Sequence, residues 1–470
     1  MPEFVATCEL PVPAAEAFAW HARPGALERL LPPWDDVRVA ARTGGIADGD
    51  RVTLSIPLPG GLMRAKWIAE HRDYREGESF QDVQVSGPFG SWEHTHTFHP
   101  TGGATCRLED RIAFTPPLGP LGMAGAGFVR GMLDGMFAFR HLRTRLDLAA
   151  HARFADDSPR RILVSGATGL VGSSLVPFLT TGGHEVVRLS GGGQGGGLFA
   201  GGVRQDRKTY EVDRDALAAN GPYDAVVHLA GESIMGRWTG SKKRAIRDSR
   251  VEGTRKLCEA LADLDELPEV LVSTSASGIY GDRGDEVLTE ESATGPEDDF
   301  LADVARDWET AVRPAREAGV RVAHPRIGIV LDPRGGALQK MLPLFKLAAG
   351  GRLGAGDQWW SWVAVDDVAG AIHHAILDRG VHGPFNVTAP QPVTNAEFTR
   401  VLADVVNRPA FVPVPSFGPK LLLGSELAEA LLFASCRVTP QALQTSGYPF
   451  RFPDLKSCLT HYLGKTRGVA

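Results

Sequence analysis

The sequence predicts an α/β protein in which a doubly wound parallel sheet carries a small C-terminal lobe and follows an α+β domain. Three observations support this prediction. After about residue 160, continuously apolar runs alternate with helical patterns, which is typical of a parallel sheet covered on both faces. The first strand-to-helix turn there carries three regularly spaced glycines. Before residue 150, several runs alternate apolar and polar residues between Gly/Pro turns, which is typical of antiparallel strands.

The N-terminal part is expected to form a helix-grip α+β domain, a curved antiparallel sheet around one long C-terminal helix. Two helical patterns, Ala14–Leu30 and about 127–150, bracket the strands. The strand-like runs are Phe4–Pro11, Arg51–Ile56, Leu62–Tyr74, Ser79–Ser86, His94–His99 and Thr105–Phe114.

The second part is expected to form the parallel sheet. Its strand-like runs are Arg161–Ser165, Glu185–Leu189, Ala225–Leu229, Glu269–Ser273 and Val320–Arg326. The helical patterns between them include Gly172–Thr181, Lys242–Leu264 and Phe300–Glu317. The tract Gly191–Gly202 is rich in glycine, and we expect a flexible loop there.

Polar and proline-rich stretches predict the domain boundaries. The stretch His151–Pro159 precedes an abrupt apolar run and indicates a linker. We therefore expect a ligand-binding domain over 1–150, a linker over 151–159 and a dinucleotide-binding domain over 160–405. Proline-rich breaks such as Val412–Pro415 then lead into a small lobe over 406–470.

The composition limits the classes of function. A chain of 470 residues with a net charge of −6 has no basic field that would attract nucleic acid. Its five cysteines are dispersed, which argues against a disulfide framework or a structural zinc site. No signal peptide is visible, and Arg130 and Asp134 interrupt the most apolar segment, so no membrane span is expected. We expect a cytoplasmic protein, and the oligomeric state stays open.

The glycine-rich turn predicts a dinucleotide site of the Rossmann type. Glycines let the backbone turn sharply and approach a pyrophosphate, and the following helix offers free N–H groups to it. A strand precedes the turn, a helix follows it, and a second strand comes about twenty residues later. The residues expected to hold the cofactor phosphates are Gly166, Thr168, Gly169, Leu170, Val171 and Gly172.

The end of the second strand indicates which nicotinamide cofactor is bound. An NAD site usually has Asp or Glu there to hold the ribose 2′-hydroxyl. This chain has Ser190 followed by glycines, with Arg188 nearby. A cation without an acid favours the 2′-phosphate of NADP, with NAD as the alternative.

Motifs in family order carry a resemblance that covers about 160–460. They are Gly166–Gly172, His228–Glu232, Gly236–Thr239, Ser249–Thr254, Gly278–Asp282, Pro325–Val330, Val363–Val368, Gly383–Val387 and Thr439–Leu443. Together they resemble the extended short-chain dehydrogenase/reductases. More narrowly they resemble the atypical subgroup labelled nucleoside-diphosphate-sugar epimerase-like or SulA-like, with its small C-terminal domain.

The resemblance implies roles for residues at the matching positions. Leu229, Ala230 and Gly231 would lie beside the cofactor ribose, and Pro325 and Arg326 would line its nicotinamide end. Arg250 stands where the family usually has an Asn that supports a proton relay, and it is counted with the cofactor-binding residues.

The catalytic helix departs from the family. Its usual Tyr and Lys, four residues apart, deliver the proton during hydride transfer. Phe300 and Val304 occupy those positions here, so the dyad is absent. Candidates to replace it are Ser275, Tyr280 and Glu232.

The first 150 residues resemble the START-like superfamily of polyketide cyclases and lipid-transport proteins. The resemblance rests on Gly77–Asp82, Gly87–Trp92 and His94–Phe98. It implies a cavity for an apolar ligand between sheet and helix, near Trp20, Trp67, Phe80, Trp92 and Phe98. His94, His96 and His99 have no carboxylate or cysteine cluster nearby in the sequence, so we expect exposed strand residues and no metal site.

Three functions remain open at this point, of which the third, lipid carriage with a redox-sensed lobe, rests on the N-terminal fold alone. The first is an NADP-dependent, epimerase-like oxidoreductase acting on a small carbonyl or hydroxyl compound. The second is an NADP-binding sensor or scaffold with reduced catalysis and an N-terminal domain for an apolar ligand. The missing Tyr/Lys dyad separates the first two, because an enzyme needs another titratable group near the nicotinamide.

Overall fold

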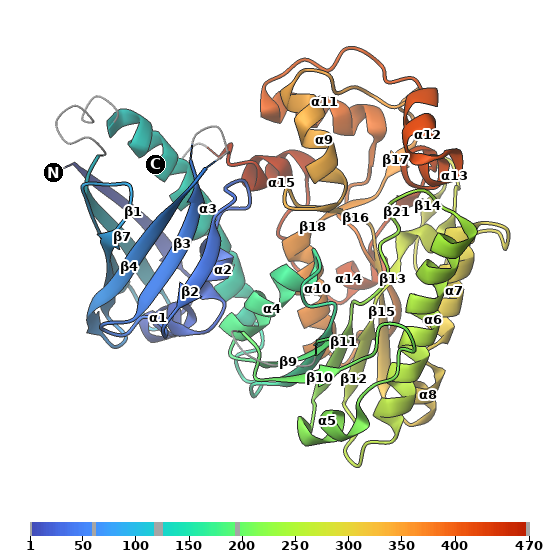
Figure 1. Cartoon of the computed structure of the whole chain (residues 1–470), viewed down its shortest axis with the longest axis horizontal. Helices are drawn as coiled ribbons and strands as arrows, with labels where there is room; N and C mark the ends of the chain where they lie inside the picture. Colours follow the sequence, from blue (N-terminus) through green and yellow to red (C-terminus); the bar gives the residue numbers. More distant parts are fainter. Residues whose placement is uncertain (1, 59–62, 117–125, 193–197, 467–470) are drawn as a thin grey trace. The chain divides into compact units, whose positions relative to one another are not determined.

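The computed structural model describes residues 2–58, 63–116, 126–192 and 198–466. The chain divides into two compact units. The first runs to Ser158 and also takes Thr180–Gly183 and the chain from His461. The second holds Pro159–Leu179 and His184–Thr460. Figure 1 labels the elements of both units.

The first unit is a seven-stranded sheet in the order β1-β7-β6-β5-β4-β3-β2, with every neighbouring pair antiparallel. Its strands are β1 (Glu3–Leu10), β2 (Arg38–Arg42), β3 (Arg51–Pro57), β4 (Arg64–Arg75), β5 (Ser79–Ser86), β6 (Ser91–Pro100) and β7 (Cys106–Thr115). Its helices are α1 (Ala14–Ala22), α2 (Ala26–Leu30) and α3 (Ala126–Ala152). The helix-grip arrangement expected from the sequence is confirmed.

Helix α3 packs on the sheet through one stripe of side chains. Val129, Leu133 and Phe137 recur every four residues and are buried, because that spacing keeps them on one helix face. They form an apolar cluster with Phe4, Trp92, Ile112 and Phe114 of the sheet. A second cluster contains Leu10, Phe18, Trp20, Phe80, Phe98 and Leu148.

Two expectations for the first unit are wrong in detail. The single helix expected over Ala14–Leu30 is two helices, because Gly25 takes a φ of 98° and interrupts the helical hydrogen bonding. The edge strand β2 was not expected, because its residues are mostly exposed and do not alternate between apolar and polar. Leu62, at the start of another expected strand, lies outside the described residues.

The second unit contains the parallel sheet, in the order β10-β9-β8-β11-β12-β15-β13, with β19 beside β15. Numbered by their order in the chain, the six neighbouring strands β10, β9, β8, β11, β12 and β15 are strands 3, 2, 1, 4, 5 and 6. This is the Rossmann order. The strands are β8 (Arg161–Ser165), β9 (Glu185–Ser190), β10 (Gly201–Arg204), β11 (Ala225–His228), β12 (Val270–Ser273), β13 (Ser275–Ala276), β15 (Arg321–Ile327) and β19 (Gly383–Val387). The expected fold class is confirmed.

Helices cover both faces of this sheet, as Figure 1 shows with α6 and α8 on one side and α4 and α10 on the other. The helices are α4 (Gly172–Thr181), α5 (Arg214–Ala219), α6 (Gly240–Ala262), α7 (Phe300–Thr310), α8 (Arg313–Glu317) and α10 (Val365–Leu377). The helix expected over Phe300–Glu317 is broken, because Pro314 occupies the first turn of a new helix. The tract Gly191–Gly202 ends in strand β10 rather than in a loop, and its residues 193–197 lie outside the described ranges.

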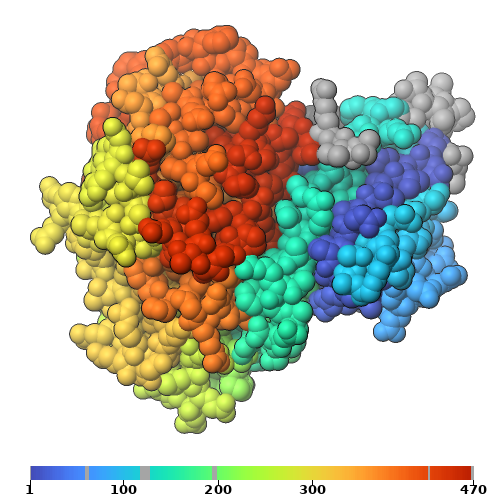
Figure 2. Space-filling model, turned by 180° about the vertical axis from the view of Figure 1, so that it is seen from behind, coloured from blue at the N-terminus to red at the C-terminus, as the bar shows by residue number. Residues whose placement is uncertain are grey.

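The C-terminal residues of the second unit pack against its middle part. In Figure 2 the orange and red segments lie against the yellow region near residue 290. Strand β14 pairs with β21 there, and β16 pairs with β18, and β17 with β20. The remaining elements are β14 (Val287–Leu288), β16 (Ile329–Leu331), α9 (Gly336–Lys346), β17 (Trp359–Trp360), β18 (Trp362–Ala364), β20 (Val393–Thr394), α11 (Asn395–Val406), α12 (Phe417–Leu423), α13 (Ser425–Ala428), β21 (Arg437–Val438), α14 (Gln441–Thr445) and α15 (Leu455–Tyr462), with a 3₁₀ turn over Ser277–Tyr280 and a π-helical turn over Glu429–Phe433.

Across the described ranges, none of the helices combines the length and the apolar character that a membrane crossing requires. Residues 117–125 of the apolar segment noted in the sequence lie outside those ranges.

Candidate cofactor-binding site

The glycine loop is held tightly against the end of the neighbouring strand. Gly166 has a φ of 67°, and a Cβ there would lie 2.8 Å from the carbonyl carbon of Leu229. A Cβ on Gly172 would lie 2.3 Å from the carbonyl oxygen of Gly166. Packing of the chain itself therefore requires both glycines.

Gly169 differs from the other two glycines. The nearest atom to a Cβ on Gly169 is the carbonyl oxygen of Gly166, at 3.3 Å, and both Gly169 and Thr168 are exposed. Among the described residues, no group accepts a hydrogen bond from the backbone N–H groups of Leu170, Val171 or Gly172. Free N–H groups at the start of a helix attract phosphate. The loop therefore fits a dinucleotide pyrophosphate.

The side chain of Leu170 packs against the start of helix α9. It lies against Gly335 and Gly336, at the start of α9, where added Cβ atoms would meet it at 2.9 and 3.3 Å. Leu170 therefore fixes the loop by packing, while its backbone N–H remains available.

Ser165 joins the loop strand to the next strand and fixes a histidine tautomer. Its Oγ accepts hydrogen bonds from the N–H groups of Leu229 and Ala230, at 3.1 and 3.2 Å. Its own proton is then donated to Nδ1 of His228, at 2.7 Å. The hydrogen of the neutral imidazole must therefore be on Nε2. Burial, assisted by the charge of Arg250, lowers the pKa of His228 to about 4 and keeps the ring neutral.

Three buried polar atoms at this sheet edge have no hydrogen-bond partner within the described part of the chain. They are Nε2 of His228, Oγ of Ser273 and Oγ of Ser275. The three residues stand at or just beyond the carboxyl ends of β11 and β12, beside the position where the strand order reverses. Open α/β sheets bind ligands outside the carboxyl ends of their strands at that position. Buried polar groups normally have partners, so these three fit contacts with a ligand.

Arg250 lies directly against the expected ribose position. Its Cζ would be 3.2 Å from a Cβ on Gly231, and its guanidinium donates to the carbonyl oxygens of Glu232 and Ile246. It stacks over the ring of Trp308, with 5.1 Å between Cζ and the ring centre. Burial lowers its pKa to about 10, although the charge of Glu232 opposes this.

Two arginines lie near the end of β9, where the sequence has no acid. The guanidinium of Arg188 lies 5.5 Å from the ring centre of Phe199. A Cβ on Gly191, directly after β9, would lie 2.6 Å from Nε of Arg207, which is exposed. Sequence reasoning missed Arg207 because it missed β10, the strand that brings this residue back to the end of β9.

Tyr280 and Arg326 form part of a buried network. The hydroxyl of Tyr280 donates to Oδ1 of Asn386 at 2.8 Å and accepts from Nη1 of Arg326 at 3.0 Å. Arg326 also makes two 2.9 Å contacts with the carboxylate of Glu309. Burial raises the pKa of Tyr280, although Arg326 opposes the shift. Pro325 is buried in the same strand, opposite Phe385.

The other two candidates for catalysis have different surroundings. Ser275 is buried at the sheet edge and lies near Glu309. Arg326 and Ser275 lower the pKa of Glu309, although burial alone would raise it. Glu232 is exposed, and its carboxylate pairs with Lys242, while its backbone N–H donates to Ser249. Glu309 and Arg326 therefore connect Ser275 with Tyr280, whereas Glu232 has separate, exposed surroundings.

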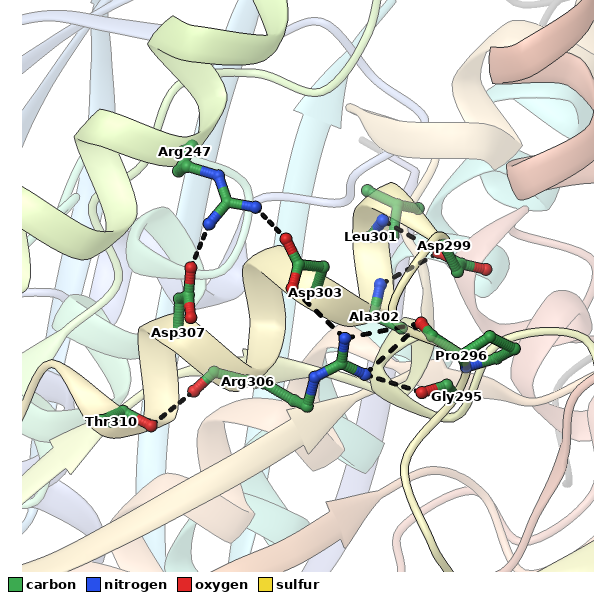
Figure 3. A network of polar contacts seen from close by, with 10 residues as sticks. All are labelled: Arg247, Gly295, Pro296, Asp299, Leu301, Ala302, Asp303, Arg306, Asp307 and Thr310. Carbon is green, nitrogen blue, oxygen red and sulfur yellow. Dashed lines mark hydrogen bonds and ion pairs between the residues drawn. The ribbon is translucent and has the colours of Figure 1, made fainter.

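Ion pairs fix the helix that would carry the missing dyad. Figure 3 shows Arg247 of α6 between Asp303 and Asp307 of α7, while the carboxylate of Asp299 caps the start of α7. Arg306 extends this network to the carbonyl oxygens of Gly295 and Pro296.

The side chains at the dyad positions are apolar and packed. Phe300 contacts the ring of Trp238 and the ammonium group of Lys243, which lies 5.0 Å from the Phe300 ring centre. Val304 is 3% exposed. No proton-transfer group stands at either position.

Known proteins match this arrangement. An epimerase family protein of Mycobacterium bovis is 38% identical over 299 residues, which cover 63% of this chain and 96% of that protein. The chain belongs to the NAD-dependent epimerase/dehydratase family. The model of that family matches residues 162–388, and a domain model of unknown function matches 414–462. Residues 10–139 match polyketide cyclase/dehydrase and lipid transport proteins, which confirms the START-like domain.

Solved structures extend the match within this epimerase family. A nucleoside-diphosphate sugar epimerase from Corynebacterium glutamicum is 36% identical with a TM-score of 0.78, and the match covers 99% of this chain and 91% of that one. The human epimerase family protein SDR39U1, solved with NADPH, is 32% identical with a TM-score of 0.58. That match covers 65% of this chain and all of the human one.

The histidines of the START-like domain correct the sequence interpretation. His94 and His96 are 3% and 8% exposed, so they are not exposed strand residues. The expectation that no carboxylate lies nearby is also wrong, because Asp82 and Asp110 contact them from neighbouring strands. His99 faces the other side of β6 and is half-buried, with 40% of its side chain exposed. Of the five aromatic residues expected near a cavity, Trp20, Phe80, Trp92 and Phe98 are buried.

Proposed function

We propose that the epimerase domain binds NADP(H) at the carboxyl edge of its parallel sheet and catalyses hydride transfer with a small carbonyl or hydroxyl compound. One observation carries this proposal. A glycine loop with free N–H groups and the buried, unpartnered polar atoms of His228 and Ser275 lie at the same carboxyl edge of the sheet. When bound, the nicotinamide supplies or accepts the hydride.

The residues that hold the cofactor are those of the loop and its neighbours. Backbone N–H groups of residues 170–172 contact the pyrophosphate, and Leu229–Gly231 with Arg250 border the ribose. Arg188 and Arg207 at the end of β9 favour the 2′-phosphate of NADP(H), since Ser190 offers no carboxylate to the 2′-hydroxyl of NAD. The NADPH in the human relative supports this choice.

Among the three candidates for catalysis, Ser275 fits best. Its buried hydroxyl has no well-aligned hydrogen bond and can turn from the Glu309 carboxylate, whose pKa it lowers, to a substrate oxygen. Tyr280 is held by Asn386 and Arg326, so we assign it a structural role. Glu232 lies at the exposed end of the same edge, where its carboxylate pairs with Lys242.

A turnover assay tests this function. The full chain is mixed with NADPH and a set of short aldehydes and ketones, and nicotinamide absorbance is followed. We expect turnover of at least one compound, and Ser275→Ala should lower kcat by roughly 100- to 1,000-fold, as expected for loss of a hydrogen bond to the reacting oxygen. NADPH affinity should be unchanged. Ser277→Ala, two residues further along, is the matched control and should keep full activity.

The second candidate function is an NADP(H)-binding sensor, and the apolar residues Phe300 and Val304 favour it. Tight NADPH binding without oxidation by any compound would support the sensor and contradict the enzyme. In either case we propose that residues 1–150 bind an apolar ligand, as the lipid transport match suggests.

A further inference from the structure

Strand register brings two histidines and two aspartates together inside the START-like domain. His94 and His96 of β6 are two residues apart and therefore face the same side of the sheet. Asp82 of β5 lies opposite His94, and Asp110 of β7 lies opposite His96. His141 of helix α3 also contacts this group, and its Nε2 lies 2.6 Å from Oδ2 of Asp110.

Three of these side chains present ligand atoms to one point. A carboxylate oxygen of Asp82 and one ring nitrogen each of His94 and His96 lie within 4.8 Å of one another. Three ligands on a metal ion, each at about 2.1 Å, are about 3 to 4 Å apart. Separations of up to 4.8 Å slightly exceed this range, so the three side chains have to move a little closer together to coordinate one ion.

The hydrogen bonding of His94 leaves a lone pair facing a carboxylate. Its Nε2 donates to Oδ1 of Asp110 at 2.9 Å. A neutral imidazole has one N–H, so Nδ1 then carries a lone pair, and it lies 3.1 Å from Oδ2 of Asp82. Two atoms with lone pairs repel each other at this distance unless a cation or a proton lies between them. The site needs positive charge at this point.

Two atoms of the cluster are buried without a well-aligned hydrogen bond. They are Oδ2 of Asp82 and Nδ1 of His96. Nδ1 of His96 lies 2.7 Å from Oδ1 of Asp110, but the angle is unsuitable for a hydrogen bond. Buried polar atoms without partners are uncommon and cost free energy, which coordination of a cation would recover.

The residues around the cluster resemble the outer shell of a metal site. Asp110 accepts hydrogen bonds from His94 and from His141, as carboxylates behind metal-binding histidines do. Phe80 stacks on His96 with ring centres 4.3 Å apart, and Phe137 meets the ring of His94 edge-on at 5.5 Å. The ligands are thereby held in place and shielded from water.

We propose that Asp82, His94 and His96 bind a divalent transition-metal ion in the START-like domain. Two imidazoles and one carboxylate suit Zn²⁺ and Fe²⁺, and three protein ligands leave a coordination position for water or an oxygen-bearing ligand. The site lies between the two apolar clusters of this domain, so a bound ion would give an otherwise apolar binding region one polar anchor.

A metal titration of the full chain tests the proposal. The protein is treated with a chelator and titrated with Zn²⁺ by calorimetry, and separately with Fe²⁺ under anaerobic conditions. We expect one equivalent of at least one of these ions to bind. His94→Ala and His96→Ala should each weaken binding at least 100-fold. Asp82→Asn, which keeps the size of the side chain, should weaken it at least tenfold.

His99→Ala is the matched control, because this histidine lies on the same strand and faces the other way. It should leave the metal affinity unchanged. NADPH binding and the melting temperature show whether each variant is folded. The proposal is overturned if the wild-type chain binds neither ion, or if binding survives unchanged in Asp82→Asn. Either result would mean that a proton on His94 supplies the positive charge.

Discussion

The carboxyl edge of the parallel sheet and the inner face of the antiparallel sheet both hold buried polar atoms, but they are built differently. At the parallel edge the key groups belong to loops that directly follow strands, such as Gly166–Gly172 after β8. In the START-like domain the groups come from three neighbouring strands and a helix, and only the register brings Asp82, His94 and Asp110 together. A site made from one continuous segment leaves a motif in the sequence, whereas a site made by strand pairing does not.

The largest expected effects distinguish Gly172, which the packing of the loop requires, from Gly169, which leaves space for phosphate. Gly172→Ala places a Cβ 2.3 Å from a backbone oxygen and should lower the free energy of unfolding of the second unit by about 3 kcal/mol or more. Gly169→Val should leave stability nearly unchanged and weaken NADPH binding more than 100-fold, because the side chain would occupy the space for phosphate. Chemical denaturation and NADPH fluorescence measure the two effects.

Gly418→Ala is the control for both loop variants, since no atom lies within 4 Å of the added Cβ. It lies in helix α12, so it should keep or slightly raise stability, because Ala favours a helix over Gly, and it should not change NADPH binding. If Gly172→Ala is as stable as the wild type, the loop is not packed as the structure shows.

A second prediction concerns the carboxylate that supports the histidine cluster. Asp110→Ala removes the acceptor for His94 and His141 and should destabilise the first unit by about 3 kcal/mol. Glu109→Ala, the neighbouring residue on the other face of β7, should cost less than about 0.5 kcal/mol. Urea denaturation of the two variants makes the comparison, and equal losses would contradict the role of Asp110.

These two regions also show how far the sequence could predict the molecule. The glycine loop, α4 and the Rossmann sheet were predictable, because buried parallel strands are continuously apolar and the loop motif is local. Strand β10 and the position of Arg207 were not, because Gly201 and Gly202 give no strand pattern. The START-like fold was predictable from alternating runs, but the burial of His94 and His96 was not. Their partners are 12 to 16 residues or more away, and only pairing defines them.

The pH dependence of the metal-free START-like domain follows from His94. Burial opposes its charge, but Asp82 and Asp110 raise its pKa from 6.5 to about 9. Because the folded value is raised, the stabilisation is fully present below pH 6.5 and is lost as the pH rises through about 9. His21, whose pKa burial lowers to about 4, is neutral in the folded protein throughout this range, so the unfolded chain's protonation adds only a small slope of opposite sign near pH 6.5.

The chelator-treated protein should therefore lose on the order of 2 kcal/mol of stability between pH 6.5 and pH 9. His94→Gln should remove this dependence. Denaturant titrations at several pH values measure it, and an equally steep loss in His94→Gln would assign the effect to another group.

The smallest effect is expected at Tyr280. Tyr280→Phe removes hydrogen bonds to Asn386 and Arg326 and should cost about 1 kcal/mol of stability. NADPH affinity and turnover should be unchanged, because the hydroxyl is enclosed in a structural network. A large loss of kcat with unchanged stability would instead place Tyr280 in catalysis.

The proposed function requires that the epimerase domain binds NADP(H) through its glycine loop and the arginines at the end of β9. Equilibrium titration of the full chain with NADPH and NADH tests it most directly, with the Arg188→Ala/Arg207→Ala variant beside the wild type. Arg313→Ala, at an exposed arginine of α8, is the control. We expect NADPH to bind at least tenfold more tightly than NADH, and the double variant to lose this preference while keeping its NADH affinity, as removal of charge-assisted contacts to a phosphate predicts. Equal affinities of the wild type for the two cofactors would contradict the account.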